Sequence, residues 1–303
     1  MNTALRAQII ALAQNARDAH EARHPLDAIS DDTFTAKITR VLDNPDTLYS
    51  VVTGPDTTRP IAFVAGTLVN APPVYNPGGP VCFVEFSASR PDINLAVMLR
   101  KLGKRAKERG AVLLVVHCSE GDTNKQTRLE NAGYTVASAW YRHTLPLTEP
   151  AADMTTTERL RSASAADVPA MLAIGERKRE EYEVYQPVFW KKADTPREEF
   201  APFVTGKVEN ENVVALVSEN ETGDINGYLL AERDGYIDDY AVATPALWPT
   251  AGRALLLEAA RRAGEKGTAG FLVVCGNRDV PKRTLLQHLN FDLCLNWYTL
   301  PLS

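Results

Sequence analysis

The spacing of apolar residues along the chain predicts an alternating series of helices and strands. Residues 3–22 carry Leu5, Ile9 and Leu12 on one helical face, and residues 93–109 carry a similar apolar stripe. Further helices are predicted over 30–42, 123–132, 166–179, 255–263 and 281–289. Strands are predicted over 48–53, 61–69, 81–88, 112–116, 158–163, 213–218, 225–232, 236–243 and 271–275. Mixed strands and helices of this kind predict an α/β protein.

The same residues return at a constant spacing of 157 positions. The pairs are Trp140 and Trp297, Tyr141 and Tyr298, Lys125 and Lys282, Thr127 and Thr284, and Tyr134 with Phe291. Because one spacing is kept across a helix and a chain end, we expect two copies of one fold. The predicted domains are 1–147 and 158–303, joined by a linker over 148–157 that is rich in Thr, Ala and Pro.

Composition narrows the class of protein. Of 303 residues, 45% are hydrophobic and 23% are charged, which is typical of a globular chain long enough for two domains. A net charge of −5 gives no general attraction to nucleic acid or to an anionic membrane. The first residues lack the apolar core of a signal peptide, and four scattered cysteines are typical of a reducing compartment. We therefore expect a cytoplasmic monomer or homodimer.

The second copy contains an ordered series of strand, loop, helix, strand and helix between Tyr236 and Phe291. Its loop reaches Gly252 and Ala254 before the paired leucines at 255 and 256, and Thr250 lies eight residues after Val242. This order resembles the GNAT superfamily of acyl-CoA-dependent N-acetyltransferases. The resemblance implies two tandem GNAT-like domains, each a twisted mixed β-sheet flanked by helices. The family's first loop glycine is Thr250 here, and its leading Arg or Gln is Leu247.

The resemblance implies a site for acetyl-CoA, the acyl donor, in the second copy. A helix N-terminus presents backbone N–H groups that can hold a phosphate. The implied residues are Val242, Ala243 and Thr244 for the pantetheine arm and thioester, Thr250, Ala251, Gly252, Arg253 and Ala254 for the pyrophosphate, and Asp279 at the family's asparagine position. The alternative is an ordinary strand–helix turn that contains a glycine.

The equivalent loop of the first copy, 90–95, is a poorer match. Arg90 fits the leading position, but Ile93 and Leu95 replace the two small residues, and Asp92 adds a negative charge. Side chains at these positions crowd the space that a pyrophosphate needs against the backbone. We therefore expect no catalytic CoA site in the first copy.

Two adjacent carboxylates are candidates for the base that deprotonates the acceptor amine. Asp238 and Asp239 lie on the strand that leads to the loop, and neighbouring strand residues face opposite sides. Asp238 shares a face with Val242 and is preferred, although a water-exposed structural aspartate is an equal alternative. Relatives often carry a tyrosine as the acid for the leaving thiolate, and that position is Leu286 here.

The acceptor pocket is predicted from residues 176–190, which mix charges with aromatic rings. Tyr182, Tyr185 and Trp190 suit a polar organic amine that has a flat apolar part. A helix whose aromatic residues pack on the rest of the protein is the alternative.

The function predicted from these residues is transfer of an acyl group, in particular acetyl, from CoA to an amine of a small molecule by the second copy. Two alternatives stay open. One is a non-catalytic pseudo-acetyltransferase that binds a metabolite or partner, and the other is a different acyl-CoA reaction such as decarboxylation. The sequence does not name the acceptor.

One metal motif is present, at His20-Glu21-Ala22-Arg23-His24, which fits H-E-x-x-H. Pro25 follows directly and the neighbouring residues are charged, so a solvated helix end is the preferred interpretation and no metal is predicted. Elemental analysis of protein purified without chelator should therefore find far less than one zinc per chain. Stoichiometric zinc that disappears in His20→Ala would contradict this.

Overall fold

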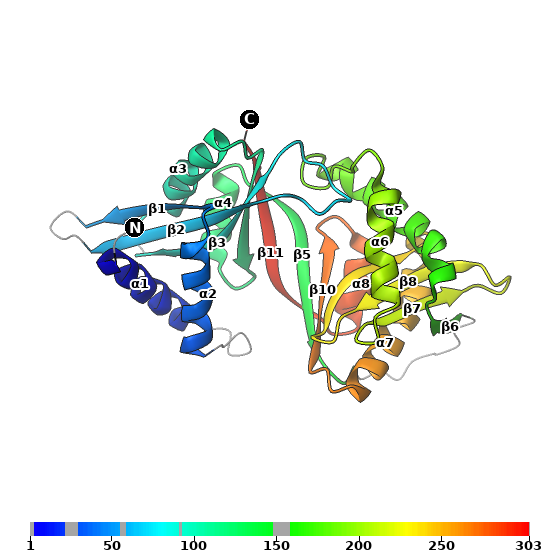
Figure 1. The fold of residues 1–303 in the computed structure, drawn as a ribbon. Coiled ribbons are helices and arrows are strands. Elements are labelled where there is room, and N and C mark those ends of the chain that lie inside the picture. Colours follow the sequence, from blue (N-terminus) through cyan, green and yellow to red (C-terminus); the bar gives the residue numbers. More distant parts are fainter. Residues whose placement is uncertain (1–2, 22–29, 55–58, 91–92, 148–157, 303) are drawn as a thin grey trace. The chain divides into compact units, whose positions relative to one another are not determined.

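The computed structural model describes residues 3–21, 30–54, 59–90, 93–147 and 158–302. They form two compact units (Figure 1). The first unit comprises 1–71, 77–135 and 297–303, and the second comprises 72–76 and 136–296. These units differ from the domains predicted from sequence, because 136–147 belong to the second unit and the last residues belong to the first. The predicted boundaries of the sequence repeat stay a prediction.

The first unit is a mixed sheet flanked by helices. Its elements are α1 (Thr3–Glu21), α2 (Asp31–Asp43), β1 (Thr47–Thr53), β2 (Pro60–Val69), β3 (Val81–Ser89), α3 (Leu95–Glu108), β4 (Leu113–Ser119) and α4 (Thr123–Asn131). Strands β1, β2 and β3 pair antiparallel, and β3 pairs parallel with β4. Phe63 and Ala65 of β2 pack against α1 and α2, whereas Gly66 faces Leu102 of α3. Alternation along β2 thus places helices on both faces.

The second unit repeats this plan. Its elements are β5 (Thr135–Thr144), β6 (Arg159–Ser162), α5 (Val168–Tyr185), α6 (Pro196–Val208), β7 (Val214–Glu219), β8 (Ile225–Ala231), β9 (Tyr236–Val242), α7 (Arg253–Glu265), β10 (Gly270–Gly276), α8 (Val280–His288) and the start of β11 (Asp292–Pro301). The strand order is β6-β7-β8-β9-β10-β5, and only β9 and β10 pair parallel among these neighbours.

Alternation along β8 divides the core of the second unit into two layers. Tyr228 and Leu230 pack with α5 and α6, and Leu229 and Ala231 pack with α7 and α8. Each face of the sheet is therefore buried under two helices, as Figure 1 shows for α5 and α6. Burial on both faces explains why these strands read as nearly continuous apolar runs.

The prediction from sequence did not include α6, and it ended α5 too early. Helix α6 contains Pro202 and buries only Val204, so it has no apolar stripe from which a helix could be predicted. Helix α5 was predicted to end at residue 179 but continues to Tyr185, through the charged segment that was assigned to the acceptor pocket. None of the described helices is long and apolar enough to cross a lipid bilayer.

A buried ion pair fixes the start of α5. Asp167 is 6% exposed and accepts two hydrogen bonds from Arg161, at 2.7 and 2.8 Å, and one from the backbone N–H of Ser164 at 2.7 Å. These hydrogen bonds, those from Arg161 first, lower the pKa of Asp167 to about 2. A carboxyl whose folded pKa lies below its unfolded value near 3.9 stabilises the fold above pH 4, and that stabilisation is lost as the pH falls to about 2.

We therefore expect Asp167→Asn to lower the free energy of unfolding at pH 7 by about 1–2 kcal/mol, after allowing for the partial exposure of Arg161. The difference from wild type should shrink as the pH falls from 4 to 2. Glu265→Gln, a change at an exposed ion pair, is the matched control and should have a smaller effect. Calorimetric unfolding at several pH values measures both variants. An equal loss at pH 2 and pH 7 would contradict the ion-pair explanation.

Candidate functional site

The parallel strands β9 and β10 pair at only two positions and then part. The paired residues are Tyr236 with Leu272 and Ile237 with Val273. On its other edge β9 pairs with β8, where Ala231 faces Ile237 and Leu230 faces Asp239. Asp238 is thus the extra residue of a β-bulge, directly after the last pair with β10. A bulge bends and twists a strand, which accounts for the separation of β9 from β10 beyond it.

The first unit has the same construction. There β3 and β4 pair up to Val84 and Val116, and a register shift between β2 and β3 makes Glu85 the extra residue. Both units therefore place an acidic bulge residue where their parallel strands part. In the second unit the carboxyl ends of parallel strands lie here, which is where open α/β sheets bind ligands.

The bulge also affects the reasoning used to choose between Asp238 and Asp239. Strict alternation does not hold across an extra residue, as shown by Ile237 and Tyr240, which both pack in the layer of α7 and α8. Alternation therefore cannot select Asp238 as the inward carboxylate. The side chain of Asp238 lies outside the described residues, so its assignment as the base stays a prediction.

A lysine side chain occupies the place where the strands part. The Nζ of Lys282, on α8, donates to the carbonyl oxygens of Tyr240 at 3.1 Å and Val274 at 3.0 Å. Lys282 is 3% exposed, and its ammonium lies 4.8 Å from the ring centre of Tyr240 and 5.5 Å from that of Trp248. Burial lowers the pKa of Lys282. One cation thus bonds to both strands beyond their last paired residues.

The backbone directions of β9 follow from these bonds. The carbonyl of Tyr240 faces the β10 side, because it accepts from Lys282, whereas the N–H of Ala243 donates to Asn226 O of β8. Backbone groups two residues apart in a strand face the same side. The N–H and C=O of Val242 therefore face the side where β9 and β10 have parted, as the predicted contact with an extended ligand requires.

The segment predicted as a phosphate-binding loop is helical. A 3₁₀ turn covers Pro245–Leu247, a π-helical turn covers Trp248–Gly252, and α7 follows without a break. Proline at the first position of a turn favours this early start and carries no N–H group. The N–H of Arg253 already points to the carbonyls of Thr250 and Trp248. The sequence predicted this helix to begin at residue 255, whereas α7 begins at Arg253 and the helical run begins ten residues earlier than predicted, at Pro245.

Gly252 makes room for a buried tryptophan. Its backbone is helical (φ −58°, ψ −53°), and a β-carbon there would lie 2.6 Å from a ring carbon of Trp248. Trp248 is 1% exposed and meets the ring of Tyr240 edge-on at 4.8 Å. The hydroxyl of Tyr240 donates to the carbonyl of Gly252 at 2.5 Å. The close approach that requires glycine here is therefore to Trp248.

A hollow of about 460 Å³ lies beside this helical run. Its walls come from the first turns before α7 and from α8. Arg253 is the only predicted site residue that lines this hollow. The remaining lining residues are Pro245, Ala246, Pro249, Val280, Pro281, Thr284, Leu285, His288 and Leu289. Sequence reasoning missed these because prolines and isolated apolar residues on two separate helices carry no common motif. The walls are mainly apolar, with Arg253, Thr284 and His288 as polar groups.

Asp279 holds two side chains of α5. Its side chain is 0% exposed and accepts from Lys178 at 2.8 Å and from the hydroxyl of Tyr182 at 3.0 Å. It also caps α8 through the N–H of Lys282 at 3.4 Å. Tyr182 therefore points to the same interior as Lys282. The role predicted for Asp279 in binding CoA stays a prediction, and the bonds shown here are to protein groups.

The other two predicted acceptor residues lie beside Tyr182. The ring of Trp190 packs at a tilt against those of Tyr182 and Tyr75, with 5.3 Å between ring centres in each pair, and its indole N–H donates to Ala137 O at 3.4 Å. The hydroxyl of Tyr185 is buried without a hydrogen-bond partner among the described residues. The structure thus brings Tyr182, Tyr185 and Trp190 together in one aromatic group, and their role as an acceptor pocket stays a prediction.

Asp239 is held by a buried arginine. Its Oδ2 accepts from Arg179 at 2.9 Å and from the hydroxyl of Tyr228 at 2.7 Å, and the Arg179 side chain is 8% exposed. Burial alone would lower the pKa of Arg179, but the charge of Asp239 raises it. If Asp239 took a proton from a substrate, its ion pair with Arg179 would be lost. These contacts oppose the predicted role of Asp239 as a base.

The neutral proton donors around the site are weak acids. Burial raises the pKa of Tyr75 and of Cys275 to about 12, and raises those of Tyr182 and Tyr240 well above the usual value. These groups keep their protons at neutral pH. Cys275 in particular is not a thiolate nucleophile.

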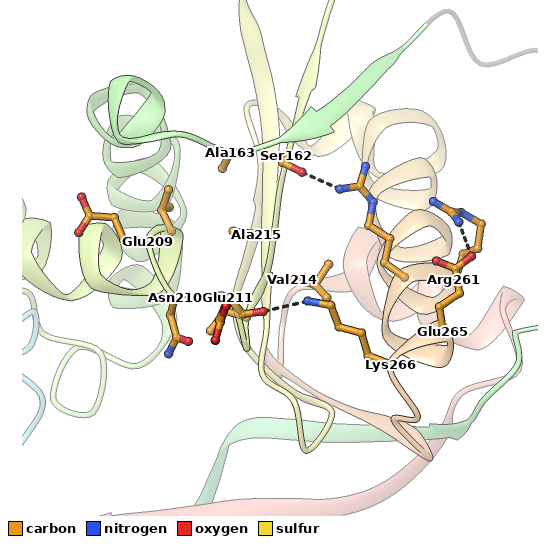
Figure 2. A pocket seen from close by; sticks show the side chains of 13 residues that line it. Ser162, Ala163, Glu209, Asn210, Glu211, Val214, Ala215, Arg261, Glu265 and Lys266 are labelled. Carbon is orange, nitrogen blue, oxygen red and sulfur yellow. Dashed lines mark hydrogen bonds and ion pairs between the residues drawn. The ribbon is translucent and has the colours of Figure 1, made fainter.

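A second hollow, of about 620 Å³, lies at the other end of α7 (Figure 2). Arg262 donates to Ser162 at 2.7 Å, Arg261 to Glu265 at 2.6 Å, and Lys266 to the carbonyl of Glu211 at 2.9 Å. Protein groups thus engage these three cations. Among the residues that the structure describes there is no cluster of three metal-ligating side chains, and the H-E-x-x-H side chains at His20 and His24 lie outside them.

The packing at Gly252 gives a test. Gly252→Ala should lower the free energy of unfolding by about 1–3 kcal/mol, because the added carbon overpacks against Trp248. Gly264→Ala, on the same helix with open space around the added carbon, should instead raise it by up to about 1 kcal/mol. Urea denaturation measures both. Equal effects in the two variants would show that Gly252 does not accommodate Trp248.

Known proteins resemble this chain in structure but not in sequence. No protein-family model matches the chain, and no curated protein matches its sequence. A GCN5-related N-acetyltransferase from Sphaerobacter thermophilus superposes with a TM-score of 0.61 at 16% identity, over 91% of this chain and 87% of that one. A GNAT-family acetyltransferase from Colwellia psychrerythraea gives 0.50 at 12% identity, over 91% and 98%.

A GCN5-related glucosamine N-acetyltransferase region of a fungal multi-domain β-N-acetylglucosaminidase gives a TM-score of 0.54 at 10% identity, over 88% of this chain and 34% of that one. At such identities the likeness shows the fold alone. The chain has the fold of the GNAT acetyltransferases.

Proposed function

We propose that this chain transfers an acetyl group from CoA to an amine of a small molecule, and that the second unit carries the catalytic site. The fold supports acyl transfer in general. The observation that carries the finer proposal is the parting of β9 and β10, which turns the backbone groups of Val242 toward an open edge. That edge lies at the carboxyl ends of both strands, next to the helical run whose hollow Arg253 lines.

The hollow suits the nucleotide end of the donor. Its apolar walls, including Pro249 and Pro281, offer flat surface to a base. Arg253 offers a fixed positive charge to a phosphate, and the N-terminal end of the helical run adds its partial positive charge. The diphosphate is therefore proposed to lie beside Arg253, toward the Pro245 end of the helical run. Val242 then receives the arm that leads from the phosphates to the acyl group.

The acceptor amine is placed on the side of α5. Tyr182 and Trp190 present aromatic faces there, and such faces attract a cationic amine. The nearby carboxylates of Asp239 and Asp279 already pair with Arg179 and Lys178. The proposed acceptor is therefore a small amine with an apolar or flat part, and its identity is left to experiment.

A second candidate function has an observation of its own. Lys282 already bonds both strands, and Trp248 fills the interior next to it. These features favour a unit that binds CoA or a related nucleotide without transferring an acyl group. The two functions differ in one result: a transferase releases the CoA thiol when an acceptor is present, and a binding protein does not.

Calorimetric titration with acetyl-CoA tests the site. The full chain should bind the donor, and Arg253→Ala should weaken binding about tenfold or more, the effect of losing one charge-assisted hydrogen bond. Arg261→Ala removes the same charge from the far end of α7, lies outside this hollow, and should leave affinity unchanged. Equal affinity in wild type and Arg253→Ala would exclude this hollow as the donor site. Binding without thiol release across a panel of amines would favour the second candidate.

A further inference from the structure

The reaction needs a proton donor that the family position does not supply. When the acceptor nitrogen bonds to the thioester carbon, the carbon–sulfur bond breaks and its electron pair leaves with sulfur. The resulting thiolate must gain a proton, while the attacking nitrogen loses one to solvent or to a base. Leu286 stands where the resemblance places a tyrosine acid, and it is 0% exposed and carries no proton to give.

Lys282 lies one turn before Leu286 on the same face of α8. Its ammonium bonds to the carbonyl of Tyr240, on the edge of β9 that Val242 also faces. Two residues along a strand span about 7 Å, so a thioester held at Val242 lies close to this ammonium. We infer that Lys282 is the proton donor to the leaving thiolate, an inference that rests on the proposed function.

The surroundings leave Lys282 as the best-suited acid among the described neighbours. Tyr240 donates to Gly252 O, Tyr182 donates to Asp279, and burial makes both phenols weaker acids. Lys178 is committed to Asp279 at 2.8 Å and to Glu181 at 2.9 Å. Only the ammonium of Lys282 combines a place between the strands with bonds to neutral carbonyls that can be exchanged for a ligand.

Several charged and titratable groups act on Lys282, and they come from each element around it. Burial lowers its pKa, and Lys178 of α5 adds to the lowering. Cys275 of β10, Asp279 at the start of α8 and Asp239 of β9 oppose it. The net shift is downward, so the ammonium gives up its proton more readily than an ordinary lysine with a pKa near 10.4.

The same three residues recur in the first unit, which supplies a control. Cys118, Asp122 and Lys125 precede Cys275, Asp279 and Lys282 by 157 positions. Asp122 caps α4 through the N–H of Lys125 at 3.1 Å, and the Nζ of Lys125 donates to Ser87 of β3 at 3.3 Å. If removing the lysine only destabilises the protein, the change should have a similar effect in both copies. If Lys282 donates a proton, only the second copy should affect the reaction.

The experiment compares full-length Lys282→Met, Lys282→Arg and Lys125→Met with wild type. Acetyl-CoA affinity is measured by calorimetry, and thiol release is followed across pH with a panel of amines. Wild-type release should fall at alkaline pH with an apparent pKa below that of an ordinary lysine. Lys282→Met should release thiol about 100-fold more slowly or worse, without that alkaline limb, while it still binds the donor. Lys282→Arg keeps the charge and should stay slow, and Lys125→Met should match wild type.

A donor with a better leaving group separates acid catalysis from a structural effect. The thioester of acetate with an aryl thiol is such a donor, because the aryl thiolate that leaves is stable without a proton. Lys282→Met should therefore lose much less rate with this donor than with acetyl-CoA. An equal loss with both donors, or an equal loss in Lys125→Met and Lys282→Met, would overturn the inference while the proposed function stands. Should Lys282→Met not fold, a wild-type rate in Lys282→Arg would overturn it as well. Wild-type protein that binds no acetyl-CoA would overturn the function and the inference together.

Discussion

The parting of two parallel strands is the constraint around which the second unit is built. Strands β9 and β10 stop pairing after Ile237 and Val273, and backbone carbonyls beyond that point still need hydrogen-bond donors in a buried place. Lys282 supplies them to Tyr240 and Val274 with a single ammonium. The sheet is interrupted here, but these backbone carbonyls still have a hydrogen-bond donor. An extended ligand could take over the same hydrogen bonds.

Charge placement around α5 follows from the same interior. Lys178 and Arg179 are adjacent in sequence, yet they pair with different carboxylates, Asp279 and Asp239. Each buried cation thus has a partner, as the cost of burying an isolated charge demands. Tyr182 joins the aromatic group to one of these pairs, because its hydroxyl donates to Asp279 at 3.0 Å. The carboxylates of this interior are therefore balanced by the protein's own cations.

The architecture could be predicted from the sequence because it depends on periodicity and repetition. The constant spacing between Lys125 and Lys282 and between Trp140 and Trp297 predicted two copies, and apolar runs predicted most strands. Helix α6 was not predicted because it contains Pro202 and lacks an apolar stripe. The helical run before α7 escaped because prolines at its turns were interpreted as a loop.

The candidate site was less predictable because it depends on contacts across the fold. Gly252 was singled out as a backbone position for a phosphate, whereas the structure shows it packed on Trp248, four residues earlier. The choice between Asp238 and Asp239 relied on strict alternation, and a bulge interrupts it. Lys282 was noticed only as part of the repeat, because a lysine near a helix start is usually solvated. The burial of Lys282 between β9 and β10 depends on how these two strands pair and then separate, which the sequence does not show.

The central claim is that the donor binds where β9 and β10 part. Hydrogen–deuterium exchange of the full chain, with and without acetyl-CoA, tests it most directly because exchange reports backbone protection segment by segment. The account predicts slower exchange at Val242–Arg253 and Val280–Leu289 when the donor is present, with Leu95–Glu108 of the first unit unchanged. Protection confined to the first unit, or bound donor without protection of Val242–Arg253, would contradict it.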